Sequence, residues 1–392
     1  MGHDVFYVSG GNLFRAANGD SKRIPCGAID NYRKTIMAIY KKKEWKTQGS
    51  GAHFMGAAVP RLEERDINAS VEAVVSVSDE RLIYASTLEA DCAIYAKSLR
   101  NPEDAEEYIT RLVNTRIYYM DYDPAGKMIV FSASDGYLEK HLALCGEEKA
   151  NYRMITEGDC VDITPSFSRK DNNIIYFSSA GFYIDRNRGG AKFSSYALCR
   201  YDLSLNELCE VLSDEKYDFI HPRQLADGKL YCIRRVKHTS GGSGQSLLDI
   251  IFAPFRFLRA VFGWANLFSQ RYSGESLIKG KSGPNPAKDR EKNEREIFIE
   301  DNLINVEKTI KENTLAGEKY PGIAPKSWEL VSIGADENIE VIKRGVLNYT
   351  FDYNGRLIYS NGKFILRDQP DGEEIICEAN VAKSLCLGIW GN

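Results

Sequence analysis

The residues of this chain that could carry out chemistry are few and widely separated. None of the five histidines forms an H-E-x-x-H motif or an i,i+4 pair, the spacings that hold a catalytic zinc ion on a helix. The G-x-S-x-G motif of a hydrolase nucleophile is also absent. Asp159 and Asp162 could act as paired carboxylates or bind calcium, but the D-x-D-x-D-G spacing of a calcium loop is missing. We therefore assign no catalytic residue, no metal ligand and no cofactor from the sequence.

Four polar residues at the connections between predicted strands are candidates for ligand binding: Arg116, Asp162, His221 and Asn348. His221 follows an apolar strand sequence and precedes a proline. Its imidazole could act as a base, contact a ligand or simply be a polar loop side chain. Whether the four residues form one site depends on whether the fold brings these connections together.

The composition limits the class of protein before any fold is assigned. The chain has 392 residues, 43% hydrophobic and 27% charged, so it is neither disordered nor a multi-span membrane protein. A net charge of −4 gives no basic field, and we expect no nucleic-acid partner. Nine cysteines without a C-x-x-C pair indicate neither a disulfide framework nor a zinc site. Because no basic and then apolar segment opens the chain, we predict a cytoplasmic protein, which could lie on the inner membrane face as a peripheral protein.

A recurring phrase sets the expected fold. A turn containing Asp, Asn or Gly leads into a short apolar strand, and five strand cores end at positions 84, 130, 176, 231 and 359, in steps of 46, 46, 55 and 128. A period near 46 is typical of one blade of a β-propeller. The turn residues supply the positive φ of a hairpin, and the β-branched and aromatic residues that follow suit a buried strand.

The two ends of the chain complete the ring in this interpretation. Residues 5–14 look like the same strand and hairpin without the strand that should precede them, and residues 383–390 form a strand without a hairpin. Joined, they make a sixth blade and close the propeller. We predict an all-β, six-bladed propeller over 1–238 and 326–392, with an insertion at 239–325 in the fifth blade. The alternative is a β-sandwich with a separate domain.

The repeat resembles that of the TolB-like family of six-bladed propellers, whose blades carry a P-S-W-S-P-D-G-K-x-I-x-F phrase. Residues 164–168, TPSFS, followed by residues 174–179, IIYFSS, are the nearest copy, with Phe167 in place of the tryptophan. The resemblance covers roughly 300 residues. It implies binding of peptides, proteins or small ligands at the central mouth, and in some members an appended peptidase. The longest step between strand cores, 128 residues, exceeds the period by only 82 residues. A hydrolase domain needs roughly 200 residues, so we expect no appended peptidase in this insertion.

A short insertion after the first blade should be helical. Within residues 28–46, Ile29, Tyr32 and Ile36 recur at helical spacing, which predicts a capping helix. Its basic residues form a solvated face or attract an acidic partner or anionic lipid. They are Arg33, Lys34, Lys41, Lys42, Lys43 and Lys46.

The large insertion contains the most apolar segment of the chain. Residues 247–268 read LLDIIFAPFRFLRAVFGWANLF, with the polar and glycine positions on one narrow helical stripe. Two central arginines and Pro254 argue against crossing a membrane. The segment could lie on a membrane surface, dock into a partner protein or pack on the propeller itself. The residues expected to make the contact are Ile251, Phe252, Phe255, Leu258, Arg259, Phe262, Trp264 and Phe268. Further on, residues 302–312 predict a short helix.

These observations favour a non-enzymatic binding or scaffolding propeller, attached through residues 247–268 to a membrane surface or a partner protein. A peptide or protein could bind at its mouth. The alternative is a propeller enzyme, a hydrolase or lyase, with an axial polar site that includes Asp162 and His221.

Overall fold

The computed structural model describes two compact units within the chain. The described residues are 4–17, 19–43, 67–78, 80–101, 104–134, 138–148, 151–185, 190–237, 296–299, 302–334 and 338–388. One unit takes residues 1–180, 195–236 and 324–392, and the other takes 181–194 and 237–323. Each unit has its own packing and is described separately.

The larger unit is a six-bladed β-propeller. Within its described residues, six antiparallel sheets each contain a four-stranded meander. Three sheets consist of β4 (Ala69–Ser78), β5 (Arg81–Leu88), β6 (Asp91–Ser98) and β7 (Glu107–Leu112); β8 (Arg116–Asp123), β9 (Met128–Ser134), β10 (His141–Gly146) and β11 (Arg153–Met154); β12 (Cys160–Phe167), β13 (Ile174–Asp185), β15 (Ala197–Asp202) and β16 (Glu207–Leu212). The other three consist of β17 (Tyr217–Gln224), β18 (Leu230–Val236), β21 (Glu329–Ile333) and β22 (Ile339–Arg344); β23 (Asn348–Phe351), β24 (Leu357–Ser360), β25 (Phe364–Gln369) and β26 (Gly372–Glu378); β27 (Ser384–Leu387), β1 (Val5–Ser9), β2 (Asn12–Ala17) and β3 (Asp20–Ile24).

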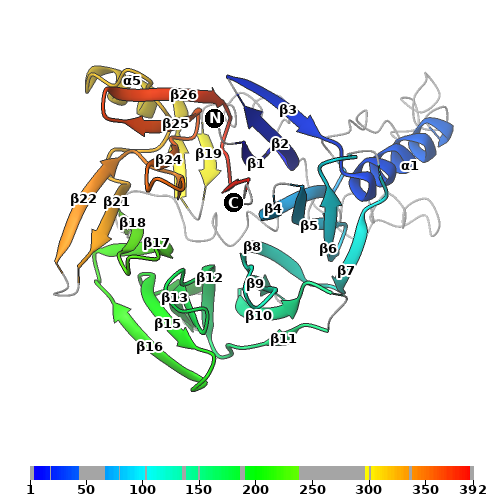
Figure 1. The fold of residues 1–392 in the computed structure, drawn as a ribbon, viewed down its shortest axis with the longest axis horizontal. Helices are drawn as coiled ribbons and strands as arrows, with labels where there is room; N and C mark the ends of the chain where they lie inside the picture. The colour runs from blue at the N-terminus through cyan, green and yellow to red at the C-terminus, as the bar shows by residue number, and fades with distance from the viewer. Residues whose placement is uncertain are drawn as a thin grey trace, which may run out of the picture. The chain divides into compact units, whose positions relative to one another are not determined.

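The blades stand around a common axis, and one strand of each blade lines it (Figure 1). The innermost strands contact one another in the order β23, β27, β4, β8, β12 and β17. The Tyr349 hydroxyl, from β23, donates to the carbonyl oxygen of His221 in β17 at 2.8 Å and so links the two ends of this series. Every innermost strand therefore has neighbours from two other blades.

The ring is closed by the two ends of the chain, as predicted. The last strand, β27, pairs antiparallel with the first, β1, and places Cys386 opposite Phe6 and Leu385 opposite Tyr7. The Lys383 N–H donates to the Val8 carbonyl at 3.0 Å beyond the end of this ladder. The predicted sixth blade is thus confirmed, with three strands from the N-terminus and one from the C-terminus.

The repeated apolar phrase forms the second strand of each blade. Its copies lie in β5, β9, β13, β18 and β24, and the N-terminal copy lies in β1. Such a strand has a paired strand on either side and a neighbouring blade over each face, so most of its side chains are buried. In β5, the residues Leu82, Ile83, Tyr84 and Ala85 are all fully buried. A continuous apolar run, rather than alternation, is what two buried faces require.

The hydrophobic core lies between adjacent blades. One cluster joins Ile83 and Ala85 of one blade to Ile117, Ile129 and Phe131 of the next. Similar clusters fill other seams of the ring. Since each blade contributes to two seams, the propeller buries its apolar side chains without a single central core.

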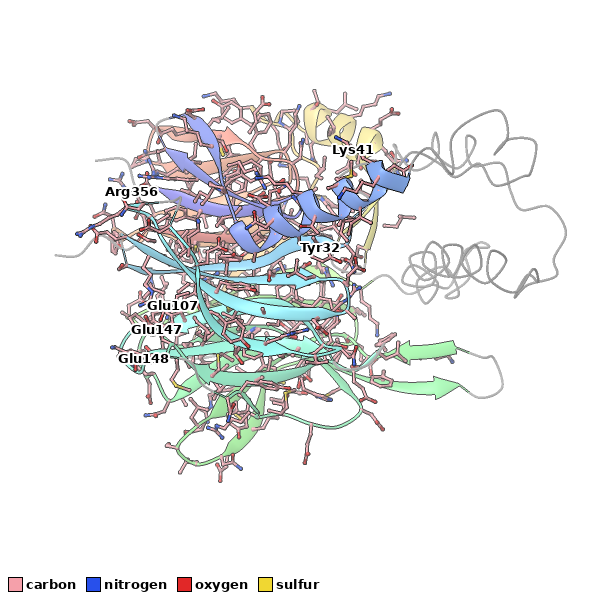
Figure 2. All side chains as sticks on the ribbon, turned by 90° about the vertical axis from the view of Figure 1, so that its right-hand side faces the viewer. Tyr32, Lys41, Glu107, Glu147, Glu148 and Arg356 are labelled. Atoms are coloured by element: carbon pink, nitrogen blue, oxygen red, sulfur yellow. The ribbon has the colours of Figure 1, made fainter. Side chains whose placement is uncertain are left out.

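The predicted capping helix is α1 (Gly27–Lys43), and Ile29 is its most deeply buried apolar residue. The Glu106 carboxylate accepts from the Gly27 and Ala28 amides at 2.8 and 3.0 Å, which satisfies the free N–H groups of the first turn. Figure 2 shows α1 from the side, with Tyr32 and Lys41 labelled. The Tyr32 hydroxyl donates to Glu89 Oε1 at 2.8 Å and ties the outer part of the helix to the next blade.

The expectation of a wholly solvated basic face was wrong for Arg33. Its side chain is buried, and Nε and Nη2 donate to the Ala69 carbonyl at 3.1 and 2.6 Å. Nη1 donates to Asn12 Oδ1 at 2.8 Å. Lys34 and Lys41 are exposed, as predicted. Arg33 is therefore a structural residue that fastens α1 to β2 and β4.

The smaller unit contains β19 (Glu296–Ile299), β20 (Asn302–Asn305), α5 (Val306–Leu315) and the hairpin of β13 with β14 (Gly190–Phe193). The predicted helix over 302–312 was wrong for its first four residues, because these pair with β19. The Asn305 side chain accepts from the Lys308 N–H at 2.9 Å and caps α5. The predicted helix at 247–268 lies outside the described residues. Among the helices that the structure does describe, none has the length and apolarity needed to span a membrane.

Candidate functional site

A pocket lies on the axis of the propeller. All six innermost strands, or the residues directly before them, contribute to its wall, and its cavity volume is about 30 Å³. Its polar side chains come mainly from β12, β17, β23 and β27 and their edges. They are Thr164, Ser166, His221, Arg223, Asn348, Lys383 and Ser384. Tyr119, Met120, Pro165, Pro222 and Leu385 add the larger apolar surfaces.

The innermost strands are irregular where they border this pocket. The ladder of β8 with β9 shifts between Ile117 and Tyr119, and that of β17 with β18 shifts after Ile220. Thr164 and His221 have φ values of +52° and +54°, and each precedes a proline. Positive φ is uncommon in residues other than glycine. Bulges of this kind change the direction of side chains and are frequent beside binding sites.

Three strands hold the backbone of His221 in this conformation. Its N–H donates to Thr164 Oγ1 at 3.1 Å, and its carbonyl accepts from the Tyr349 hydroxyl. The Thr164 hydroxyl is also within 3.0 Å of Ser178 Oγ. Burial raises the pKa of Tyr349 well above its usual value, so this residue stays neutral and can donate. The Tyr119 ring meets the His221 ring edge to face, with centroids 5.6 Å apart.

The charged groups of the pocket are cationic. Among the described residues, no carboxylate is part of the lining, whereas Arg223 and Lys383 are. The guanidinium of Arg223 is half-buried, and no described residue forms a hydrogen bond or ion pair with it. Asn348 is fully used by the protein, because Nδ2 donates to the Lys383 carbonyl and Oδ1 accepts from the Tyr349 N–H, both at 2.7 Å. The pocket thus presents an unpaired arginine to an open cavity.

The structure brings together two of the four residues predicted for an axial site. His221 and Asn348 line the pocket, whereas Arg116, exposed at the start of β8, and Asp162 are not among the lining residues. Sequence reasoning missed Arg223. The alternation of the strand gave no signal for it, because the ladder of β17 shifts between Ile220 and Arg223.

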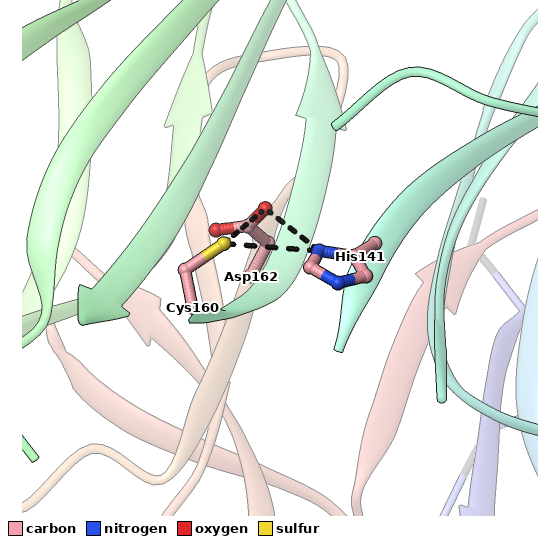
Figure 3. A group of neighbouring side chains, drawn as sticks. All are labelled: His141, Cys160 and Asp162. Atoms are coloured by element: carbon pink, nitrogen blue, oxygen red, sulfur yellow. Dashed lines mark hydrogen bonds and ion pairs between the residues drawn. The ribbon is translucent and has the colours of Figure 1, made fainter. Parts of the chain in front are cut away.

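Asp162 instead lies in a cluster at the seam between two blades. Figure 3 shows it with Cys160, also in β12, and His141, which begins β10 of the preceding blade. Cys160 Sγ lies 3.5 Å from Asp162 Oδ2 and 3.7 Å from His141 Nδ1. His141 Nδ1 and Asp162 Oδ2 are 3.9 Å apart. Burial and then the Asp162 carboxylate raise the pKa of Cys160 to about 12, so the thiol is protonated here.

The backbone fixes the positions of these three residues. Lys140 and Val161 form a parallel bridge, in which the Asp162 N–H donates to the Lys140 carbonyl at 2.8 Å. This bridge sets His141 beside Asp162 across the seam. Cys160 and Asp162 point to the same side because they are two residues apart in one strand.

Comparisons with known proteins give likenesses in fold only. No protein-family profile and no curated protein sequence matches the chain. Among solved structures, TolB from Acinetobacter baumannii is 12% identical with a TM-score of 0.49, covering 99% of this chain and 67% of TolB. The nidogen/laminin complex structure is 8% identical with a TM-score of 0.48, covering 98% of each chain. An oligogalacturonate lyase from Vibrio parahaemolyticus is 11% identical with a TM-score of 0.40, covering 95% of this chain and 73% of the lyase. The sheet topology itself makes this chain a six-bladed β-propeller, in line with the TolB-like resemblance of its repeat.

Proposed function

We propose that this protein is a binding module whose axial pocket captures a peptide through a carboxylate group. The observation that carries the proposal is Arg223: a half-buried guanidinium, unpaired among the described residues, in a pocket whose lining includes no carboxylate. A guanidinium presents parallel N–H groups that match the two oxygens of a carboxylate. Lys383 adds a second positive charge at the same wall.

The remaining lining suits a peptide better than a small inorganic anion. Met120, Pro165 and Leu385 offer apolar surface beside the cations, and the Ser166 hydroxyl adds a polar group. Pockets that combine apolar walls with a few polar groups orient organic ligands. A carboxylate-bearing peptide places a charge on Arg223 and side chains on this apolar surface.

The test uses fluorescently labelled pools of short random-sequence peptides, one with free C-terminal carboxylates and one with amidated C-termini, at equal charge elsewhere. We expect the full-length protein to bind the carboxylate pool more tightly, as measured by fluorescence anisotropy. Hydrogen bonds to a charged group are worth about 1.5 to 3 kcal/mol, so Arg223→Gln should weaken binding roughly 10- to 100-fold. Equal binding of the two pools, or an unchanged affinity in Arg223→Gln, would contradict the proposal.

Arg116→Gln is the matched control. Arg116 is also an arginine of an innermost strand, but it is exposed and does not line the pocket. Its removal changes the net charge by the same amount as Arg223→Gln. We expect it to leave the affinity within about twofold, because an exposed charge contributes little. A loss as large as that of Arg223→Gln would indicate general electrostatic attraction instead of a site.

The alternative of an axial enzyme gains no specific support. It needs Asp162 and His221 to act on one bound molecule, and only His221 borders the pocket. Asp162 is buried with Cys160 and His141 at a seam. We therefore favour binding without catalysis.

Attachment to a membrane surface through residues 247–268 is the second part of the proposal. Its support is the sequence of that segment, which combines many large apolar side chains with arginines on one stripe. Co-sedimentation with anionic and neutral vesicles tests it, using the full chain beside a variant in which residues 240–296 are replaced by a Gly/Ser linker. Binding that disappears in the variant supports attachment, and equal sedimentation of both proteins refutes it.

A further inference from the structure

We propose that His141, Cys160 and Asp162 form a binding site for a divalent transition-metal ion, with zinc as the best fit. The three side chains come from two adjacent blades and converge at their seam (Figure 3). One ligand atom from each lies within 4.8 Å of the other two. The proposed site is separate from the axial pocket, whose lining includes none of the three residues.

The distances between the ligand atoms are close to those around a tetrahedral ion, and two of the three are slightly longer. Zinc bonds of about 2.0 to 2.3 Å at tetrahedral angles place ligand atoms roughly 3.3 to 3.6 Å apart. The observed separations are 3.5 Å for Sγ to Oδ2, 3.7 Å for Sγ to Nδ1 and 3.9 Å for Nδ1 to Oδ2. An ion could be bound with side-chain shifts of a few tenths of an ångström. The last separation is too long for a hydrogen bond, and the two side chains form an ion pair when His141 is protonated.

The chemistry of the three ligands selects the class of ion. A thiolate and an imidazole favour zinc and its neighbours in the first transition series, whereas magnesium and calcium prefer oxygen ligands. Three protein ligands leave one tetrahedral position for water or another molecule, as in zinc sites that exchange a ligand. The spacing from His141 to Cys160 fits no short zinc motif. That explains why the sequence predicted no metal.

Hydrogen bonds from neighbouring serines hold Asp162 in position, as such bonds do for the ligands of known metal sites. Ser179 Oγ donates to Asp162 Oδ1 at 2.6 Å, which leaves Oδ2 directed at the other two ligands. Ser132 Oγ donates to the Asp162 carbonyl at 2.6 Å and fixes the backbone. Asp162 is only 1% exposed, so its carboxylate is held in place without an ion. The site therefore needs little rearrangement on binding.

The local charge also favours a cation. Glu139 and Asp159 add negative charge nearby in the sequence, two residues before His141 and one before Cys160. The nearest lysine in sequence, Lys140, directs its ammonium over the Tyr118 ring, 4.3 Å from the centroid. A metal ion at this seam would bridge two blades, because His141 lies in β10 and Cys160 and Asp162 lie in β12.

The experiment uses the full-length protein, stripped with a chelator and titrated with Co²⁺ and then Zn²⁺. We expect one Co²⁺ per chain, with a thiolate-to-cobalt charge-transfer band and the intense visible bands of tetrahedral cobalt, all removed by Zn²⁺. Bridging two blades should raise the thermal midpoint by about 5 °C at a hundredfold excess over Kd. Mg²⁺ and Ca²⁺ should produce neither effect.

Variants distinguish the site from adventitious binding. Cys160→Ser should abolish the charge-transfer band, and His141→Gln should weaken Co²⁺ binding at least tenfold, with the circular dichroism of both variants unchanged. Cys209→Ser removes an exposed cysteine elsewhere and should retain the full cobalt spectrum. A charge-transfer band that persists in Cys160→Ser, or a wild-type chain that binds no stoichiometric Co²⁺, would overturn the proposal and leave a simple hydrogen-bonded cluster.

Discussion

Removing one charge of a buried ion pair should be the most damaging conservative change in the propeller. Arg235 is 1% exposed at the end of β18, and its Nε donates to Asp218 Oδ2 at 3.1 Å. The guanidinium also lies over the Trp328 ring, 5.4 Å from the centroid. Asp218→Asn keeps an oxygen that can accept from the Tyr196 N–H, now at 3.0 Å from Oδ1, but leaves the arginine without its counter-charge. Breaking such a buried pair costs about 3 to 5 kcal/mol, because a buried charge is left uncompensated.

Urea denaturation followed by far-UV circular dichroism measures this cost. With a slope of about 3 kcal/mol/M, the midpoint should fall by roughly 1 to 1.7 M. The double variant Asp218→Asn with Arg235→Met should recover most of that loss, because it removes the buried positive charge and keeps the acceptor of the Tyr196 N–H. Lys22→Ala, which removes an exposed charge, is the control and should leave the midpoint unchanged. A loss below about 1 kcal/mol in Asp218→Asn would refute the reasoning, because it would mean that water or another group already compensates Arg235.

Three further predictions concern the turns, the closure and the pH dependence of the propeller. Gly11→Ala should lower the free energy of unfolding, measured by urea denaturation, by at least about 1 kcal/mol more than Gly10→Ala does. Both glycines have positive φ, but only at Gly11 would a Cβ lie 2.8 Å from Ser70 Cβ. Equal losses in the two variants would contradict this prediction. Leu385→Asp should lower the free energy of unfolding by more than about 3 kcal/mol, because it buries a carboxylate in the closing strand β27. The backbone amides of β1, which pairs with β27, should then lose their protection from hydrogen exchange. Retained protection would show that closure does not depend on β27. Burial raises the pKa of Cys232 to about 12 from the usual 9.0. The neutral thiol therefore contributes fully to stability below pH 9, and this contribution is lost as the pH rises toward 12. A urea midpoint that does not fall between pH 8 and 11 would contradict this prediction.

The ring was predictable because its strongest signal is local. A strand buried on both faces has to be apolar at every position, so runs such as Leu82 to Ala85 stand out in the sequence and repeat with the period of a blade. The unmatched strands at the two ends could be paired for the same reason. The boundaries of helices were less accurate, as residues 302–305 show. These residues have helical spacing, but they pair with β19 as a strand. The spacing within residues 302–312 holds no information about β19, which is a separate segment of the chain.

The roles of individual polar residues were harder to predict. Arg33 lies four residues after Ile29, on the helix face that packs on the propeller, and its acceptors are the carbonyl of Ala69 and the side chain of Asn12 on other elements. His141 precedes Cys160 by 19 positions, and only the parallel bridge between two blades brings the pair together. Neither relation leaves a pattern within one element. The same holds for Arg223, because the surrounding strands decide that no described residue pairs with its guanidinium.

Periodicity, turn residues and the complementary ends of the chain thus predict the number of blades and the way the ring closes. Both features depend on burial along single strands, which the sequence shows directly. The composition of the axial wall does not follow from them. Alternation along a strand says which face a residue takes, but the register shift beside His221 and the positive φ of Thr164 and His221 interrupt that alternation beside the axis. This backbone conformation is stabilised by hydrogen bonds between different blades, such as His221 N–H to Thr164 and Tyr349 to His221. Contacts between distant segments therefore decide which polar groups meet in the pocket and at the seam, and only the closed ring creates those contacts.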